Sequence, residues 1–295
     1  MEFAIYAGFS RYILENGFEK AAAYAKKLGF SAVEMLADKK YNPVPDVETA
    51  KQAKAVFDKY GLKVACHSVC VNLWDSDSRH ASGYKISEVD EQFLMNQVEV
   101  AATLGSPYVH HTLLPWLTLP LDAPEYGEAI ETAVEAAVRV ADYAATFGIT
   151  CIYEDQGYYV NGVEGFGGFY SRMKARCKNV GICGDLGNIL FVNETPEAFL
   201  EANMKDVCHV HIKDYLWKKA KVSPGMYWHH AKEDSWLRDT MIGNGVVDFE
   251  ACLKLLKAAG YNGYFSLENA HPEPYEVGVQ QAMEYLERCW QEENM

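Results

Sequence analysis

The chain has 295 residues, a length that suits one large barrel or two domains of ordinary size. Hydrophobic residues make up 49% and charged residues 23%, which excludes a disordered or collagen-like chain. With 41 acidic and 27 basic side chains, the net charge of -14 opposes binding to nucleic acid and to anionic membranes, and we expect neither as a partner.

The first residues, 1–12, carry neither a basic segment nor an apolar run long enough for a signal peptide or a membrane span. We therefore expect a cytoplasmic protein. The eight cysteines include no Cys-x-x-Cys pair, and most of them lie within apolar runs. This pattern is typical of reduced, buried thiols and argues against a disulfide framework.

Short runs of β-branched and aromatic residues alternate with longer amphipathic stretches along the whole chain, which predicts alternating strands and helices. The predicted strands begin at Phe3, Ser31, Leu62, Pro107, Ile149, Val180, Val207 and Gly263. An open doubly wound sheet would carry a glycine-rich phosphate loop after its first strand, and residues 7–12 do not form one. Eight strand-helix units predict an α/β fold, a single (β/α)₈ TIM barrel that forms one catalytic domain over residues 1–295.

Two connections are longer than the rest, residues 156–165 after the fifth predicted strand and residues 215–244 after the seventh. In a barrel both would lie above the mouth that the carboxyl ends of the strands form. Their aromatic side chains would then line or cover the site, unless the loops pack only on themselves. These aromatics are Tyr158, Tyr159, Phe166, Trp217, Tyr227, Trp228 and Trp236.

Ionisable residues, Glu34 and His67 among them, gather at the predicted carboxyl ends of the strands, although a barrel strand is buried on both faces and tolerates charge poorly. Residues two apart in a strand share a face. On this rule, each of the last four strands directs one ligand-type side chain inward, namely Glu154, Asp185, His211 and Glu268. Three carboxylates and one imidazole favour one divalent metal ion, Mn²⁺ first, with Mg²⁺ or Co²⁺ as alternatives.

Each of these residues taken alone has a structural alternative. Asp185 could cap the following helix, and Lys213 could pair only with the aspartate next to it. The side chains of His67, His110 and His111 could be hydrogen-bonded core residues. The recurrence of ligand-type groups at four consecutive strand ends favours a metal site over these separate explanations.

Four segments of the second half resemble the signature of the xylose isomerase-like barrels, the sugar phosphate isomerase/epimerase family. They are DLGNI from Asp185, HVHIKD from His209, IGNGVVDF from Ile242 and GYNGYFSLEN from Gly260. In D-tagatose 3-epimerase-like members, Glu, Asp, His and Glu from the last four strands hold one divalent ion. The resemblance assigns these roles to Glu154, Asp185, His211 and Glu268, and it makes the two glutamates the catalytic pair for proton transfer next to a carbonyl.

The chain departs from the family pattern at two places. Asn188 stands where family members often have a histidine, and an amide can hydrogen-bond a hydroxyl but cannot exchange protons. Lysines, Lys213 among them, stand where the epimerases carry an arginine, and Lys213 could hold an anionic group or an enolate oxygen. We expect the sugar-like substrate to be contacted by Glu34, His67, His111, Asn188 and Lys213.

Several other activities occur on this fold. A ketoinositol dehydratase, or the large subunit of a C-glycoside deglycosidase acting on a 3-oxo-glucoside, would follow the same proton abstraction with β-elimination. The aromatic-rich connections would suit an aryl aglycone, and His110 or His111 could supply the acid or base. An apurinic endonuclease would need three zinc ions and more histidines, and the net charge opposes duplex binding.

The sequence therefore predicts a metal-dependent sugar isomerase or epimerase, with a β-eliminating lyase as the alternative. A non-catalytic barrel is disfavoured because all four ligand-type residues are present. The expected ligand is a small sugar or sugar derivative. We expect a homo-oligomer, or a hetero-oligomer with a small subunit if the protein is a deglycosidase.

Overall fold

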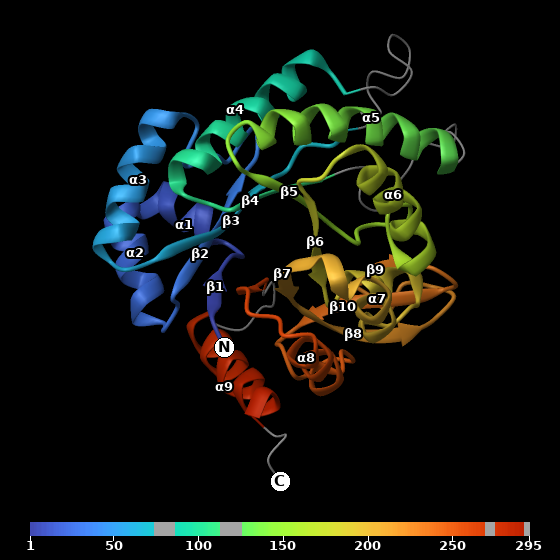
Figure 1. Ribbon diagram of the computed structural model, residues 1–295. Helices are drawn as coiled ribbons and strands as arrows, with labels where there is room; N and C mark the ends of the chain where they lie inside the picture. Colours follow the sequence, from blue (N-terminus) through green and yellow to red (C-terminus); the bar gives the residue numbers. More distant parts are fainter. Residues whose placement is uncertain (74–85, 113–125, 269–274, 292–295) are drawn as a thin grey trace.

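The computed structural model describes residues 1–73, 86–112, 126–268 and 275–291, and it contains a closed barrel of eight parallel strands (Figure 1). Each barrel strand pairs with the next barrel strand along the chain, and the last barrel strand closes on the first. The strands are β1 Phe3–Ile5, β2 Ala32–Ala37, β3 Lys63–Val69, β4 Tyr108–His111, β5 Thr150–Glu154, β6 Val180–Asp185, β7 Val207–Ile212 and β11 Phe265–Leu267. The predicted (β/α)₈ barrel is confirmed, and every barrel strand overlaps the run that predicted it.

Helices surround the strands on the outside of the barrel (Figure 1). They are α1 Phe9–Asn16, α2 Phe18–Lys27, α3 Val47–Lys59, α4 Glu88–Leu104, α5 Tyr126–Ala145, α6 Gly162–Arg176, α7 Pro196–Asn203, α8 Phe249–Ala258 and α9 Tyr275–Gln291, with short 3₁₀ turns η2 Asn188–Val192 and η3 Met204–Asp206. Asp46 and Ser87 cap α3 and α4 by accepting hydrogen bonds from backbone amides of the first turn. Among the described helices, none is both long and apolar enough to cross a membrane.

The main apolar core lies between the strands and the helices. One large cluster includes Phe57 and Phe249, and a second includes Tyr153 and Phe169. Inside the barrel the side chains are smaller. One layer contains Ala4, Ala32 and Ala65, and the next contains Cys66, Ile152 and Cys183. These layers fill the barrel below its carboxyl-end mouth, so it is a packed core and not a pore.

Most of the connection expected as a loop after β7 is a three-stranded antiparallel sheet, seen at the lower right of Figure 1. Its strands are β8 Asp214–Lys219, β9 His229–Ala231 and β10 Ser235–Thr240, in the order β8-β10-β9. The turn between β9 and β10 passes through Glu233 and Asp234, with φ of 57° and 58°. Such turns usually carry asparagine or glycine, so the common sequence signal of a hairpin is missing here.

The connection after β5 is shorter than predicted because α6 begins at Gly162. Phe166 belongs to α6, is fully buried and packs against Phe199 of α7 at 5.1 Å between ring centroids. It therefore lies in the helical layer and does not form a wall of the mouth. The hydroxyl of Tyr158 donates a hydrogen bond to the carbonyl of His230, which ties this connection to the three-stranded sheet.

Candidate active site

The four side chains assigned to the metal meet at the carboxyl ends of β5, β6, β7 and β11. The Nδ1 atom of His211 lies 3.0 Å from Oε2 of Glu154, 3.8 Å from Oδ2 of Asp185 and 3.7 Å from Oε2 of Glu268. Pairing between β6 and β7 places Asp185 beside His211 in the barrel wall. Three of the four side chains are buried, and that of Glu268 is 30% exposed, so solvent reaches the cluster beside Glu268.

Lys213 follows β7 and places its ammonium group among the same carboxylates. Its Nζ lies 2.9 Å from Oδ2 of Asp185 and 2.8 Å from Oε2 of Glu268, and it donates a hydrogen bond to Oδ1 of Asn188 at 3.1 Å. The alternative in which Lys213 pairs only with Asp214 is therefore wrong. The carboxylate of Asp214 instead accepts hydrogen bonds from backbone amides of residues 243–247, which follow β10. Asn188 is buried, and its Nδ2 has no hydrogen-bond partner in the described part of the chain.

The two glutamates of the cluster differ in proton affinity. Burial by itself would raise the pKa of Glu154, but the neighbouring His110, His211 and Lys213 lower this pKa to about 2. Burial raises the pKa of Glu268 to about 7, although Lys213 opposes that shift. Near neutral pH, Glu154 is therefore ionised while Glu268 can take up or release a proton, and this difference is typical of an acid/base pair.

The donor set fits a divalent metal ion. One donor atom each from Glu154, Asp185 and His211 lies within 4.8 Å of the other two. Backbone amides of Gly187 and Asn188 donate to Oδ1 of Asp185 at 2.8 Å, so the other oxygen, Oδ2, faces the cluster. An oxygen-rich set with one imidazole suits Mn²⁺, Mg²⁺ or Co²⁺, and together with Glu268 these residues could hold one ion.

Two of the predicted substrate contacts, His67 and His111, do not reach the mouth. The Nε2 atom of His67 lies 2.9 Å from Oε1 of Gln97 in α4, and the ring of His111 packs edge-on against Tyr153 at 5.2 Å. Burial lowers the pKa of both imidazoles to about 4. Both side chains lie between strands and helices, because their neighbours in the strand take the inward positions. The structure thus corrects the expectation for these two residues.

Glu34 also differs from expectation, since it lies within β2 and not at its end. Its carboxylate accepts a hydrogen bond from Oγ of Ser68 at 2.6 Å, and its oxygens lie 2.8 Å from Nε2 of His209 and 3.0 Å from Nε2 of His211. Burial would raise the pKa of Glu34, but the two histidines hold it well below the usual range. The carboxylate is fully buried and engaged by protein groups, which leaves it no position for a substrate contact.

Three further residues belong to the mouth. The Nε2 atom of His110 is buried without a hydrogen-bond partner in the described residues and lies 3.6 Å from Oε1 of Glu154. Tyr6, just after β1, stacks on His211 with ring centroids 5.0 Å apart, and Gln156 donates to Glu154 at 2.8 Å. Strand alternation would have selected His110 over His111, whereas no pattern in the sequence singled out Tyr6.

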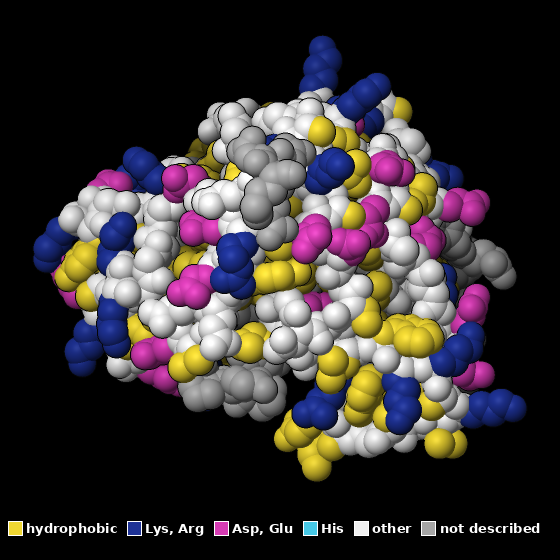
Figure 2. All heavy atoms as spheres, turned by 90° about the horizontal axis from the view of Figure 1, so that it is seen from below, with side chains coloured by type: hydrophobic (Ala, Val, Ile, Leu, Met, Phe, Trp, Pro, Cys, Tyr) yellow, Lys and Arg dark blue, Asp and Glu magenta, His cyan; other side chains and the backbone are white. Residues whose placement is uncertain are grey.

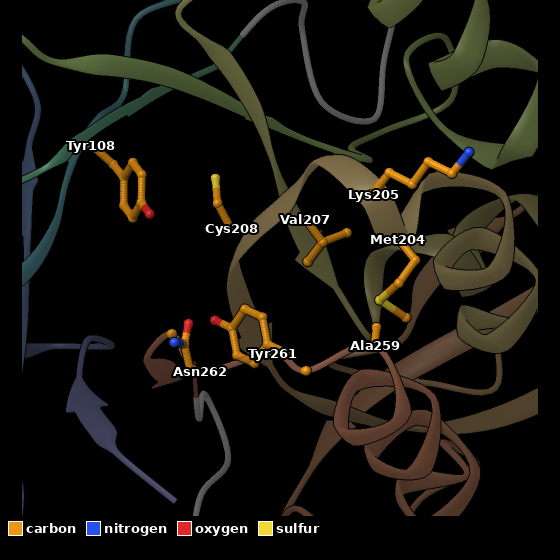
Figure 3. Close-up of a pocket in the computed structure, with 10 residues that line it drawn as sticks. Tyr108, Met204, Lys205, Val207, Cys208, Ala259, Tyr261 and Asn262 are labelled. Carbon is orange, nitrogen blue, oxygen red and sulfur yellow. The ribbon is translucent and has the colours of Figure 1, made fainter.

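A separate cavity of about 380 Å³ lies at the opposite, amino end of the barrel (Figure 3). Tyr108, Cys208 and Tyr261 face one another across it, and Lys205 is the one charged side chain that lines it. Burial raises the pKa of Tyr108 to about 12 and that of Cys208 to about 11, so both groups are neutral at physiological pH. The hydroxyl of Tyr261 donates to the carbonyl of Tyr264 at 2.6 Å.

Comparison of the sequence with known proteins identifies relatives over nearly the whole chain. A family model described as a xylose isomerase-like TIM barrel matches residues 22–289. An inosose isomerase of Halalkalibacterium halodurans is 22% identical over 282 residues, which cover 92% of this chain and 89% of that protein. An inosose dehydratase of Geobacillus thermodenitrificans is 25% identical over 170 residues, which cover 55% of each chain.

Two solved structures illustrate the likeness in fold. The apo form of YcjR from E. coli, a 3-keto-D-glucoside 4-epimerase, superimposes with a TM-score of 0.70 at 17% identity, covering 98% of this chain and all of that one (100%). The IOLI protein with a bound zinc atom gives a TM-score of 0.69 at 18% identity, covering 98% of each chain. At these identities, the likeness establishes the fold alone.

Proposed function

Since the chain belongs to the xylose isomerase-like TIM-barrel family, we propose that it is a divalent-metal-dependent isomerase or epimerase of a sugar-like carbonyl compound. Its relatives are sugar isomerases, epimerases and inosose dehydratases, and the chain is an enzyme of that kind. The observation that carries the proposal is the convergence of Glu154, Asp185 and Glu268 around Nδ1 of His211.

A divalent ion held by Glu154, Asp185, His211 and Glu268 would supply Lewis acidity toward a carbonyl oxygen and its neighbouring hydroxyl. Glu154, which is ionised, accepts the proton from the carbon next to the carbonyl. Glu268, whose pKa burial raises to about 7 in the metal-free protein, would return a proton to the other face of that carbon through its oxygen that does not bind the metal. The ammonium of Lys213, 2.8 Å from Glu268, balances the negative charge that develops on the substrate oxygen.

The substrate we propose is a small polyol that carries a ketone, such as a ketose or a ketoinositol. The inosose isomerase match covers 92% of the chain, which supports isomerisation as the outcome. The dehydratase match covers 55%, and elimination from an oxidised sugar would begin with the same proton abstraction. The two outcomes differ in whether the carbanion is reprotonated or expels a β-substituent.

We propose Mn²⁺ as the metal, with Mg²⁺ and Co²⁺ as alternatives, because oxygen donors outnumber nitrogen in the cluster. Burial raises the pKa of the nearby thiols of Cys66 and Cys183 well above the usual value, so these thiols are neutral in the metal-free protein. The zinc found in the IOLI structure supports a divalent ion on this fold.

A nucleic acid substrate is disfavoured by the charge of the chain. The net charge is -14, and on the face shown in Figure 2 the Lys and Arg side chains are interspersed with Asp and Glu. A binding surface for duplex DNA would gather positive charge on one face. Homo-oligomerisation remains a proposal from the family resemblance, and sedimentation velocity of the purified protein would test it.

The test of the proposed reaction is proton NMR in deuterium oxide with Mn²⁺-treated protein, followed by removal of the paramagnetic ion before spectra are recorded. The panel contains free ketoses, ketoinositols and 3-oxo-glucosides. We expect deuterium at the carbon next to the carbonyl together with a new isomer, and no exchange with the Asp185→Asn variant. Absence of exchange from every compound, with metal bound, would contradict the proposal. Elimination without a new isomer would establish the lyase alternative.

A further inference from the structure

Glu34 is a buried carboxylate that takes no direct part in the proposed reaction. It lies inside the barrel, fully buried, on the side of His211 opposite to the proposed metal ligands. Three groups point at it: Oγ of Ser68 at 2.6 Å, Nε2 of His209 at 2.8 Å and Nε2 of His211 at 3.0 Å. So many donors around one carboxylate indicate a role in orienting its neighbours.

The direction of each hydrogen bond follows from the chemistry of the groups. A carboxylate accepts hydrogen bonds and donates none, so Nε2 of His211 must carry a hydrogen that points at Glu34. The other nitrogen, Nδ1, lies 3.0 Å from Glu154 and 3.7 Å from Glu268, so without a metal it also carries a hydrogen that points at a carboxylate. A bound cation would replace that hydrogen on Nδ1, whereas the hydrogen on Nε2 stays with Glu34. Glu34 thereby leaves the correct nitrogen of His211 available to a cation.

A second chain of hydrogen bonds runs from Glu34 to His110. Ser68 has one hydroxyl hydrogen and uses it toward Glu34, so its oxygen accepts from Nδ1 of His110 at 3.1 Å. His110 is then protonated on Nδ1 and carries its lone pair on Nε2. That nitrogen is buried, has no hydrogen-bond partner among the described residues and lies 3.6 Å from Oε1 of Glu154.

We propose that Glu34 is a positioning residue that sets the tautomers of two mouth histidines. It presents Nδ1 of His211 to the metal and, through Ser68, presents Nε2 of His110 as an acceptor for a hydroxyl of the substrate. Carboxylates that hold the second nitrogen of a metal-binding histidine have this effect in other metal sites. The inference rests on the proposed function for the identity of the metal and the substrate, whereas the hydrogen-bond chain itself involves protein groups alone.

Long-range ¹H–¹⁵N NMR of histidine-labelled protein tests the tautomers directly. In the metal-free wild-type protein, we expect a hydrogen on Nε2 of His211, held by Glu34, and His110 as the Nδ1–H form. The opposite tautomer at either histidine would overturn the proposed role toward that residue. This result does not depend on metal binding, so failure of the proposed function and failure of this inference are distinguishable.

Two variants test the hydrogen bonds toward His211 and toward His110 separately. Glu34→Gln keeps the shape but replaces one acceptor oxygen with a donor NH₂, so we expect mixed tautomers at His211 and Mn²⁺ affinity weakened by about 10- to 100-fold in EPR titrations. Ser68→Ala should abolish the preference for Nδ1–H at His110 and raise KM by about three- to tenfold, the cost of one hydrogen bond, with Mn²⁺ affinity unchanged.

The matched control is Ser10→Ala. Ser10 is also a buried serine, and its Oγ accepts a hydrogen bond from the amide of Leu36 at 2.8 Å without touching either histidine. We expect this variant to lose stability but to keep both tautomers and the Mn²⁺ affinity. Unchanged tautomers and Mn²⁺ affinity in a folded Glu34→Gln variant would overturn the proposal. If Glu34→Gln does not fold, the wild-type tautomers and Ser68→Ala decide it.

Discussion

The two ends of the barrel differ in the chemistry of the groups that surround them. At the carboxyl end, three carboxylates and an ammonium lie within 4 Å of one another or of His211. At the amino end, a cavity of about 380 Å³ is lined mainly by phenols, a thiol and apolar groups, and Lys205 is its one charged side chain among the described residues. The cavity offers volume with little charge, whereas the mouth concentrates charge. In this protein, the cluster of opposed charges marks the candidate site better than the empty volume does.

At the amino end, polar side chains donate hydrogen bonds to backbone carbonyls. Tyr261 donates to the carbonyl of Tyr264 at 2.6 Å, and the thiol of Cys208 donates to the carbonyl of Ile182 at 3.5 Å. At the mouth, by contrast, Nε2 of His110 and Nδ2 of Asn188 have no hydrogen-bond partner in the described residues. Buried polar atoms left without partners are costly, so these two atoms of the mouth are available to hydrogen-bond a ligand.

The largest effect that would sharpen this contrast is expected from Glu154→Gln. Loss of the proposed base should lower kcat/KM by on the order of 10²- to 10⁴-fold. The control is Glu201→Gln, which makes the same change on an exposed residue of α7 and should leave kcat/KM unchanged. Steady-state kinetics on the substrate identified by NMR measures both. Comparable activity of the two variants would remove Glu154 from the mechanism.

Asp185→Asn should remove the metal from the mouth. Since loss of a residue that merely supports a ligand weakens metal binding about 10- to 100-fold, loss of this proposed ligand should weaken it by at least about 100-fold. Metal analysis after dialysis and calorimetric titration give the affinity. Asp206→Asn, a change near the amino end where the carboxylate pairs with Lys174 at 2.9 Å, should bind metal as the wild type does. Equal affinities of the two variants would contradict the assignment.

The pH dependence of metal binding follows from the proton affinities of the proposed ligands at the carboxyl end. Burial raises the pKa of Glu268 to about 7, and the proton must leave before the carboxylate can coordinate a metal. Burial would lower the pKa of His211, but Cys183 and Glu34 raise it above the usual value. His211 must likewise lose a proton before it can bind the metal. Metal affinity should therefore rise by at least about tenfold per pH unit between pH 5.5 and 7. Calorimetry that finds no pH dependence would exclude this site.

The smallest effect is expected from Tyr261→Phe at the amino end. The variant loses the hydrogen bond to Tyr264, which should lower the free energy of unfolding by about 1 kcal/mol. Urea denaturation measures this change. The catalytic rate should stay within about twofold of the wild type, because a lost hydrogen bond at this end acts on stability alone. A tenfold loss of activity would place function at the amino end and break the comparison.

The barrel and the clustering of the four proposed ligands could be predicted because both depend on local, periodic signals. Strand alternation with period two assigns Glu154, Asp185, His211 and Glu268 to inward positions, and parallel strands bring their carboxyl ends together. The three-stranded sheet after β7 could not be predicted in the same way, since its tight turn uses Glu233 and Asp234 in place of the usual glycine or asparagine.

The depth of a side chain within the barrel was the part that the sequence did not determine. Glu34 and His67 were expected at strand ends, but β2 continues to Ala37 and β3 to Val69, and the pairing of β2 with β3 shifts register between Val33 and Glu34. Glu34 lies below the mouth because β2 continues beyond it, and His67 points to the helices because Ser68, its neighbour in β3, faces inward.

Anomalous diffraction from crystals soaked in Mn²⁺ would locate the metal site. We expect one strong anomalous peak per chain at the carboxyl end, bounded by Nδ1 of His211 and by the carboxylates of Glu154, Asp185 and Glu268. A peak in the amino-end cavity, or no peak at the mouth when Mn²⁺ is in large excess, would contradict the proposal that this end of the barrel is the metal-dependent active site.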